Sequence, residues 1–138
     1  MNHTKMRRIQ YFYAMVKDEP GAAYRLLTQV ASAEVNLLAF QAIPMGPGVT
    51  QLVLFPETAE RLAFAAERTG IVLTGPHTAF LVQGTDRLGA LIELHEKLSE
   101  ARVNVYASYG VTDGQGGYGY VFFVRPDDYE RAAGVLGV

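Results

Sequence analysis

The sequence contains no cysteine and no tryptophan, and only 19% of its residues are charged. The absence of cysteine excludes disulfides, zinc–thiolate sites, iron–sulfur clusters and thiol nucleophiles. The 12 lysines and arginines nearly balance the 14 aspartates and glutamates, so the chain lacks the basic excess typical of nucleic-acid and anionic-membrane binding. No stretch reaches the roughly 20 consecutive apolar residues that a membrane span needs. The composition therefore argues against a membrane or nucleic-acid partner.

What is present is ordinary globular material: 138 residues, 49% of them apolar, enough for one domain or two very small ones. Residues 1–8 are polar and basic, and the apolar run after them stops at Lys17 and Asp18 without a small-residue cleavage site. This pattern is not typical of a signal peptide. We therefore expect a cytoplasmic protein.

The chain repeats itself, which indicates duplication. With an offset of 68 positions, Asp18 aligns with Asp86, Gly21 with Gly89, Leu26 with Leu94, Val35 with Val103, Asn36 with Asn104 and Ala39 with Ala107. Further along, the offset becomes 70 and aligns Pro56 with Pro126, Glu60 with Glu130 and Arg61 with Arg131. A hairpin loop of different length would explain the change. We divide the chain at the turn-rich tripeptide Thr74, Gly75 and Pro76, into repeats 1–75 and 76–138.

Each repeat has the order strand, helix, strand, strand, helix, strand. In the first, aromatic and branched residues predict strands at 9–16, 36–43, 49–55 and 71–73. Its helices are predicted by apolar stripes at helical spacing: Ala23, Leu26, Leu27 and Val30, then Ala59, Leu62, Ala63 and Ala66. Pro20 fits the first turn of the first helix, and Gly70 ends the second.

In the second repeat, strands are expected at 78–82, 103–109 and 118–125. The helix stripes are Leu91, Leu94, His95 and Leu98, then Tyr129, Ala132, Ala133 and Leu136. Only Gly137 and Val138 follow, so the last strand of this repeat is expected to be missing. The predicted fold class is α+β: two ferredoxin-like βαββαβ repeats, with antiparallel sheets and the helices on one face.

Two motifs connect this order to a known family. The first is the turn Asp18, Glu19, Pro20, Gly21, and the second is an asparagine between apolar residues at Asn36 and at Asn104. In their order and spacing they resemble a tandem pair of ACT domains, the amino-acid-sensing modules attached to many metabolic enzymes. The second turn, from Asp86 to Gly89, lacks the proline.

The resemblance implies a ligand, an amino acid or a related small metabolite, held between two modules. Backbone N–H groups at a helix N-terminus suit its carboxylate, and Gly21 would let it approach the backbone. Asp18 can accept hydrogen bonds from its ammonium group, and the amides of Asn36 and Asn104 can bind either end. The candidate ligand-binding residues are Asp18, Glu19, Pro20, Gly21, Asn36, Asp86, Gly89 and Asn104. The structural alternative is that these residues only form turns.

No arrangement of residues indicates catalysis. No histidine pair has metal-ligand spacing along a helix, and no serine lies in a Gly-x-Ser-x-Gly motif. His95 lies where the first repeat has Leu27, so we expect it to be packed. We expect a non-enzymatic regulatory protein, without metal or cofactor, that acts on an enzyme partner.

Two other functions stay open: an RNA-binding pair of ferredoxin-like domains, and an assembly module without a ligand. Residues 116–123, Gly-Gly-Tyr-Gly-Tyr-Val-Phe-Phe, resemble the RNP1 motif, whose aromatic rings stack on bases, and Phe80 could serve as a second platform. Against RNA binding, Gly116 stands where the motif has a lysine or arginine. The second repeat also carries five basic and eight acidic residues.

The strands of the second repeat also predict self-association. Residues 103–109 and 118–124 are uncharged and carry apolar or aromatic side chains on both faces, so both faces need to be covered. The missing last strand would leave an unpaired sheet edge. A two-fold homodimer would satisfy both needs, and the alternative is that the two repeats cover each other within one chain.

Overall fold

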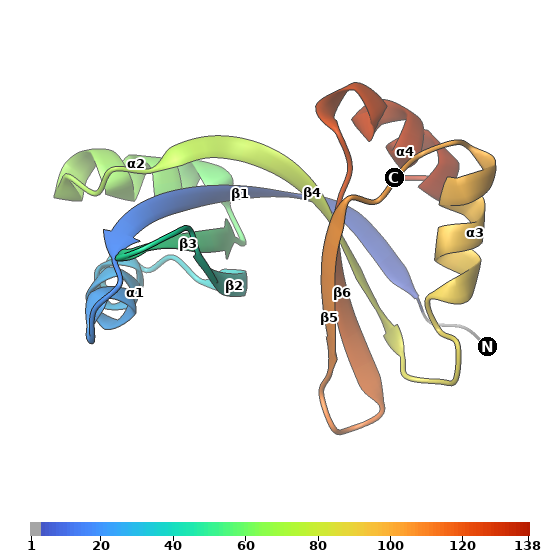
Figure 1. The fold of residues 1–138 in the computed structure, drawn as a ribbon, viewed down its shortest axis with the longest axis horizontal. Helices are drawn as coiled ribbons and strands as arrows, with labels where there is room; N and C mark the ends of the chain where they lie inside the picture. The colour runs from blue at the N-terminus through green and yellow to red at the C-terminus, as the bar shows by residue number, and fades with distance from the viewer. Residues whose placement is uncertain (1–3) are drawn as a thin grey trace. The chain divides into compact units, whose positions relative to one another are not determined.

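The computed structural model describes residues 4–138; residues 1–3, part of the polar N-terminal segment, lie outside the described residues. Figure 1 shows the elements in chain order. They are β1 (Lys5–Lys17), α1 (Ala22–Ser32), β2 (Leu37–Pro44), β3 (Val49–Pro56), α2 (Ala59–Thr69), β4 (Thr74–Thr85), α3 (Ile92–Glu100), β5 (Ala107–Thr112), β6 (Gly117–Phe123), the 3-10 turn η1 (Pro126–Asp128) and α4 (Tyr129–Leu136).

The chain forms two compact units. One is Gln10–His77, here called the first unit, and the other, the second unit, combines Thr78–Val138 with residues 4–9. Strands β1 and β4 each pass from one unit into the other, so the units do not coincide with the two sequence repeats. In the part of the chain that the structure describes, no helix has the length and apolar character of a membrane span.

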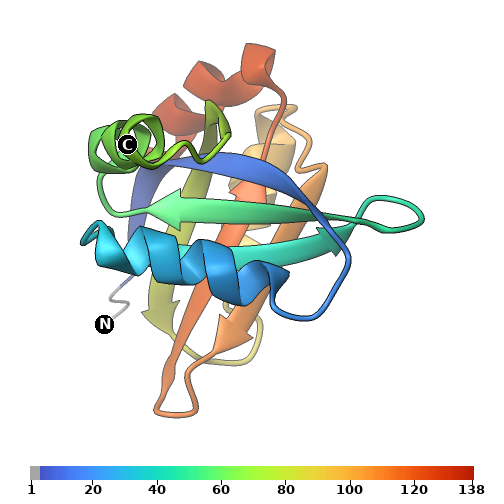
Figure 2. The ribbon, with the colours of Figure 1, turned by 90° about the vertical axis from the view of Figure 1, so that its left-hand side faces the viewer.

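In the first unit the strand order is β1, β3, β2, with antiparallel pairing that sets both Phe12 and Phe40 opposite Leu54. Helices α1 and α2 lie on the same side of these strands, as Figure 2 shows from the helix side. The core between the layers is built mainly from leucine, valine and alanine around one phenylalanine: Phe12, Ala14, Leu26, Val30, Val35, Leu52, Leu54, Leu62 and Ala65.

The predicted helix stripes are partly corrected. In α1, Leu26 and Val30 are buried as expected. In α2 the buried residues are Leu62, Ala65 and Ala66, whereas the expected Ala63 is exposed. Alanine is small and compatible with both faces of a helix, so the alanine-rich stripe left the direction of the buried face poorly defined.

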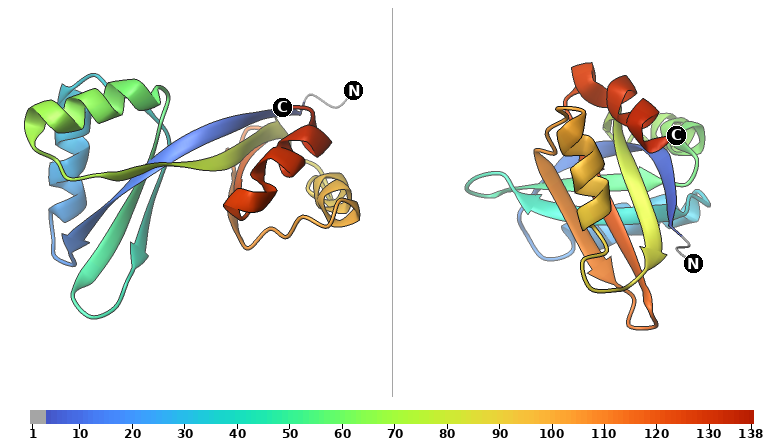
Figure 3. Two further views of the ribbon diagram at one scale, coloured as in Figure 1. Left: turned by 90° about the horizontal axis from the view of Figure 1, so that it is seen from above. Right: turned by 90° about the vertical axis from the view of Figure 1, so that its right-hand side faces the viewer.

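In the second unit β4, β6 and β5 pair antiparallel, and Phe80 lies opposite Phe122. Figure 3 shows α3 and α4 together on one side of these strands. The core here is aromatic: the Phe80 ring packs on Phe122 and Tyr129, with ring centroids 5.1 Å and 4.5 Å apart. Each unit thus has the predicted antiparallel strands with both helices on one face.

The strand registers confirm the duplication and correct its detail. Ala39 lies opposite Phe55, and Ala107 lies opposite Phe123, 68 positions later on both strands. The hairpins match as well, because Pro44 pairs with Thr50 as Thr112 pairs with Tyr118. The expected difference in hairpin length is therefore wrong. The two extra residues lie after β6, where η1 precedes α4.

Among the described residues no strand follows α4, which agrees with the last strand expected to be missing from the second repeat. The start of β1, which the sequence placed in the N-terminal tail, joins the second unit beside β4. Thr4 Oγ1 would lie 3.1 Å from a Cβ atom at Gly84, and Met6 packs against the aromatic core. The expected uncovered edge is corrected accordingly, because this segment occupies the place of the missing strand.

The junction between the repeats is a strand and not a turn. β4 runs through Thr74, Gly75 and Pro76, and the strand expected at 71–73 is absent. A Cβ atom at Gly75 would lie 2.8 Å from Tyr11 O and 2.9 Å from Phe12 Cδ2, so the glycine permits close approach of β1. The expected strand at 103–109 starts later, at Ala107, because Val103 N still donates to Leu98 O at the end of α3.

Candidate functional site

The turn before α1 is held by its own backbone. Gly21 is the N-cap residue with φ 89°, in the left-handed region that glycine adopts without strain. Ala22 N donates to Glu19 O over 3.3 Å, and Asp18 N donates to Gly48 O over 3.0 Å. The sequence placed Pro20 in the first helical turn. This prediction is wrong, because Pro20 precedes the N-cap residue.

A cavity of about 400 Å³ lies beside this turn, entirely within the first unit. Its walls come from the end of β1, from α1 and from residues 69–72 after α2. Three charged side chains line it: Lys17, Glu19 and Arg25. The exposed apolar side chains of Met15 and Val72 lie in the same lining, so the cavity has both charged and apolar residues around it.

One ion pair joins two of the three charged side chains. Arg25 Nη2 donates to Glu19 Oε1 over 3.0 Å, and both side chains stay largely exposed. A Cβ atom at Gly21 would lie 3.1 Å from Arg25 Nη1, so the missing side chain at Gly21 makes room for the guanidinium. A guanidinium carries five N–H donors, and those not used by Glu19 can bind a carboxylate together with the Lys17 ammonium. The Glu19 carboxylate can accept from a ligand ammonium group.

The other candidate residues do not join this cavity. Asn36 Nδ2 donates to Glu57 Oε1 over 2.9 Å, and Glu57 N donates to Asn36 O over 2.9 Å. This reciprocal pair ties the start of β2 to the residue after β3, which is a structural role. Asn104 lines a separate cavity of about 370 Å³ in the second unit.

The second turn also has a local structural explanation. Asp86 N donates to Gly116 O over 2.9 Å, which joins the end of β4 to the β5–β6 hairpin. Gly89 has φ 72°, and a Cβ atom there would lie 2.8 Å from Ile92 Cδ1. The predicted set is thus distributed over several places, and only Glu19 lines the cavity beside the first turn.

Solved structures have a similar fold. Protein BT0572 from Bacteroides thetaiotaomicron superposes with a TM-score of 0.78 at 14% identity, over 96% of this chain and 88% of that one. The regulatory subunit of aspartate kinase from Thermus thermophilus gives a TM-score of 0.64 at 12% identity, over 97% and 94% of the two chains. Aspartokinase alpha and beta subunits give 0.58 at 18% identity, over 96% and 93%. No protein-family profile and no curated protein sequence matches the chain.

The chain has the tandem ACT-domain fold. Within it, the repeat alignment separates the two turns chemically. Lys17, Glu19 and Arg25 of the first ACT-like repeat correspond to Thr85, Arg87 and Glu93 of the second. The second repeat has an acid where the first has the guanidinium, and Glu93 forms an ion pair with Lys97 on the same helix. Lys17 and Arg25 were missed by the motif, although the repeat alignment itself contained this signal.

The RNA-binding alternative finds no support at its aromatic residues. Tyr120, Phe122 and Phe80 belong to the buried core of the second unit, so their rings cannot stack on bases. His95 is packed as expected, half-buried with Nε2 2.8 Å from Tyr120 Oη. Within residues 4–138, no group of three or more possible metal ligands comes together.

Proposed function

We propose that this chain is a regulatory protein that binds an amino acid or a closely related zwitterionic metabolite in the cavity beside the first turn. The observation that carries the proposal is the set of Lys17, Glu19 and Arg25 around a cavity of about 400 Å³. Two cations and one carboxylate complement the carboxylate and the ammonium of a free amino acid. The apolar side chains of Met15 and Val72 in the lining can pack against the ligand's side chain.

We further propose that the cavity lies at an interface between ACT-like modules of two chains. Val72 is 84% exposed and Met15 is 50% exposed, and both lie at the cavity. A second copy over this rim would bury both side chains and close the site. This homodimer no longer depends on an uncovered sheet edge, because the start of β1 lies there. Light scattering at micromolar concentration should give a mass of two chains, and a single-chain mass that persists on concentration contradicts the dimer.

The proposed role is to pass ligand binding on to an enzyme partner. The similarity to a regulatory subunit of aspartate kinase supports a regulatory role of this kind. In this proposal the chain has no catalytic activity of its own. The alternative, an assembly module without a ligand, does not explain why three charged side chains line this cavity.

A thermal-shift screen with the twenty amino acids tests the proposal. A ligand at one hundred times its dissociation constant should stabilise the protein by about 2.7 kcal/mol. Arg25→Gln should weaken binding at least about ten-fold, since it removes the charge that pairs with the ligand carboxylate. Glu93→Gln, at the matched position of the second repeat, is the control and should leave binding unchanged.

Two results would refute this function. One is a screen in which no amino acid raises the melting temperature. The other is a ligand whose affinity, measured by calorimetry, is the same for Arg25→Gln as for the unaltered protein.

A further inference from the structure

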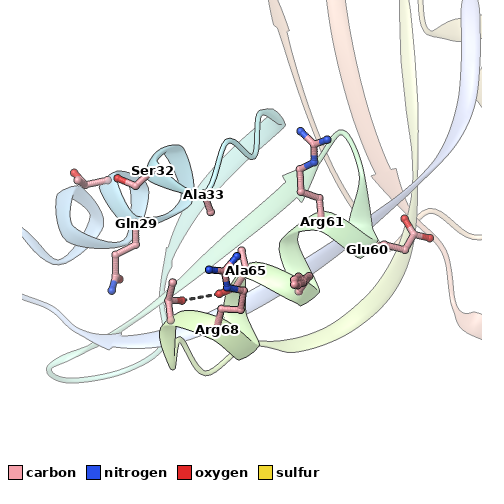
Figure 4. Close-up of a pocket in the computed structure, with 10 residues that line it drawn as sticks. Gln29, Ser32, Ala33, Glu60, Arg61, Ala65 and Arg68 are labelled. Carbon is pink, nitrogen blue, oxygen red and sulfur yellow. Dashed lines mark hydrogen bonds between the residues drawn. The ribbon is translucent and has the colours of Figure 1, made fainter.

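A larger groove lies between α1 and α2 of the first unit, with a volume of about 690 Å³ (Figure 4). It is lined from α1 by Thr28, Gln29, Ser32 and Ala33 and from α2 by Glu60, Arg61, Phe64, Ala65, Arg68 and Thr69. Its volume falls within the range of small-molecule sites, roughly 300–1,000 Å³. Gln29 and Thr69 line both this groove and the cavity beside the turn, but the groove lacks Lys17, Glu19 and Arg25, so the two have different chemistry.

An aromatic ring and a guanidinium lie together in this groove. Phe64 is 52% exposed, which is unusual for a phenylalanine, and the Arg68 guanidinium carbon lies 5.5 Å from its ring centroid. Among residues 4–138, Arg68 forms no ion pair with a carboxylate. Its guanidinium is therefore available to an anion beside an apolar surface.

Arg61 adds a second guanidinium to the groove, with one hydrogen bond to a backbone carbonyl. Its Nη1 donates to Glu34 O over 3.2 Å and makes no ion pair within the described residues. The matched Arg131 of the second unit donates to Ala101 O, to Arg102 O and to Asp128 Oδ1. The position of Asp128 corresponds to Thr58, so the first unit has no acid there to neutralise its arginine.

The matched helices of the second repeat, α3 and α4, carry different residues at the positions that line the groove. Thr28, Gln29 and Ser32 correspond to Glu96, Lys97 and Glu100, which form an ordinary charged and solvated helix face. Phe64 and Arg68 correspond to Gly134 and Val138. The aromatic ring, the two available guanidinium groups and the neutral α1 face are thus specific to the first unit.

We propose that the α1–α2 groove is a second binding site, for a small carboxylate that carries an aromatic ring. The ligand ring packs on Phe64 and the alanines of the two helices, and its carboxylate pairs with Arg68. The Ser32 hydroxyl and the Gln29 amide supply further donors, whereas the Thr28 and Thr69 hydroxyls already donate to Tyr24 O and Ala65 O. Glu60 is the one carboxylate in the lining, and Figure 4 shows it pointing away from α1. The groove therefore has a net positive charge, which suits a monoanion.

NMR titration of the full chain with 3-phenylpropionate tests this site. Saturable amide shifts are expected in residues 28–33 and 60–69. Arg68→Gln should weaken the affinity at least about ten-fold, and Phe64→Ala by a similar factor, because each removes one half of the proposed contact. The uncharged 3-phenylpropanamide should bind as weakly to the unaltered protein as 3-phenylpropionate binds to Arg68→Gln.

Two controls separate this site from the one beside the turn. Arg25→Gln should leave 3-phenylpropionate binding unchanged, while Arg68→Gln should leave amino-acid binding beside the turn unchanged. The groove proposal is overturned by loss of 3-phenylpropionate binding in Arg25→Gln but not in Arg68→Gln. It is also overturned if 3-phenylpropionate causes no saturable amide shifts at concentrations up to about 10 mM. A third contrary result is a dimer whose mass, measured by light scattering, falls to that of one chain in Phe64→Ala, because a second copy would then cover the groove.

Discussion

In the first unit the turn before α1 brings Lys17, Glu19 and Arg25 to a cavity, whereas the matched residues of the second unit pair along a helix or face solvent. The strand registers of the two units agree residue for residue through both hairpins. Duplication therefore preserved the backbone plan while the surfaces changed independently. The unit that carries both proposed sites is the one whose α1 face has the neutral Thr28, Gln29 and Ser32 where α3 has Glu96, Lys97 and Glu100.

The cores of the two units also differ in composition. The core of the first unit is mainly leucine, valine and alanine, whereas the second is filled by stacked rings of Phe80, Phe122 and Tyr129. Arg8 of β1 further ties the second unit together, with Nη1 and Nη2 donating to the Glu130 carboxylate over 2.8 Å and 3.1 Å. This hydrogen bonding raises the pKa of Arg8.

The largest expected effect comes from the matched core positions Leu54 and Phe122, both 0% exposed. Phe122→Ala should destabilise the protein by about 3–5 kcal/mol and Leu54→Ala by about 2–5 kcal/mol. Because β1 and β4 run through both units, urea unfolding followed by circular dichroism should stay a single transition in each variant. Two separate transitions, with only one shifted by either substitution, would show that the units unfold independently.

Removal of residues 1–9 should have the next largest effect, and on the second unit first. It takes away buried Ile9 and the packing of Met6, which together should cost about 3 kcal/mol or more, and it also removes the exposed ion pair of Arg8. It also uncovers β4 and should promote association through that edge. Denaturant unfolding and light scattering measure both effects, with the exposed Arg7→Ala as control. A truncated protein that unfolds at the same urea concentration and does not associate contradicts this role for β1.

This part of β1 shows the limit of the sequence. Apolar periodicity was sufficient for the helices and for most strands, because their buried faces repeat at the spacing of each element. The segment Lys5–Arg8 of β1 carries basic residues and packs mainly through Met6, so no apolar pattern indicates a strand. The glycine and proline of β4 look like a turn for a similar reason, since a close approach of two strands leaves no local signal.

The candidate site was predictable only in part. The turn motif included Glu19, which lines the cavity, but it favoured glycine and asparagine over the other charged lining residues, Lys17 and Arg25. Those two side chains belong to the end of a strand and to a helix, and only the folded unit brings them to one cavity. Asn36 matched the family motif, yet it pairs with Glu57, whose distance of 21 residues along the chain hides the contact from a local pattern.

A smaller difference between the units should appear at alkaline pH. Burial raises the pKa of Tyr109 to about 12, while the matched residue of the first unit is Gln41, which does not ionise. An unfolded tyrosine ionises near pH 10, so the folded state is favoured below that pH and loses stability as the pH rises from about 10 to 12. Burial also raises the pKa of Tyr129, which adds to the effect.

Tyr109→Phe should therefore reduce, without abolishing, the fall in unfolding free energy between pH 10 and 12. Urea unfolding at a series of pH values measures it, and Tyr24→Phe, at an exposed tyrosine of the first unit, is the control. An unchanged pH dependence in Tyr109→Phe would mean that this side chain does not set the alkaline limit.

The smallest effect should separate the two asparagines that the family motif treats alike. Asn36→Ala removes the hydrogen bond to Glu57 and should cost about 1 kcal/mol, since exposed hydrogen bonds to charged groups contribute on that order. Asn104→Ala lies at a cavity wall in the second unit and should change stability by less than about 0.5 kcal/mol. Urea denaturation resolves the difference. If Asn104 contacts a ligand instead, its substitution lowers amino-acid affinity in calorimetry while stability stays constant, and the proposed site would then have to include a residue of the second repeat.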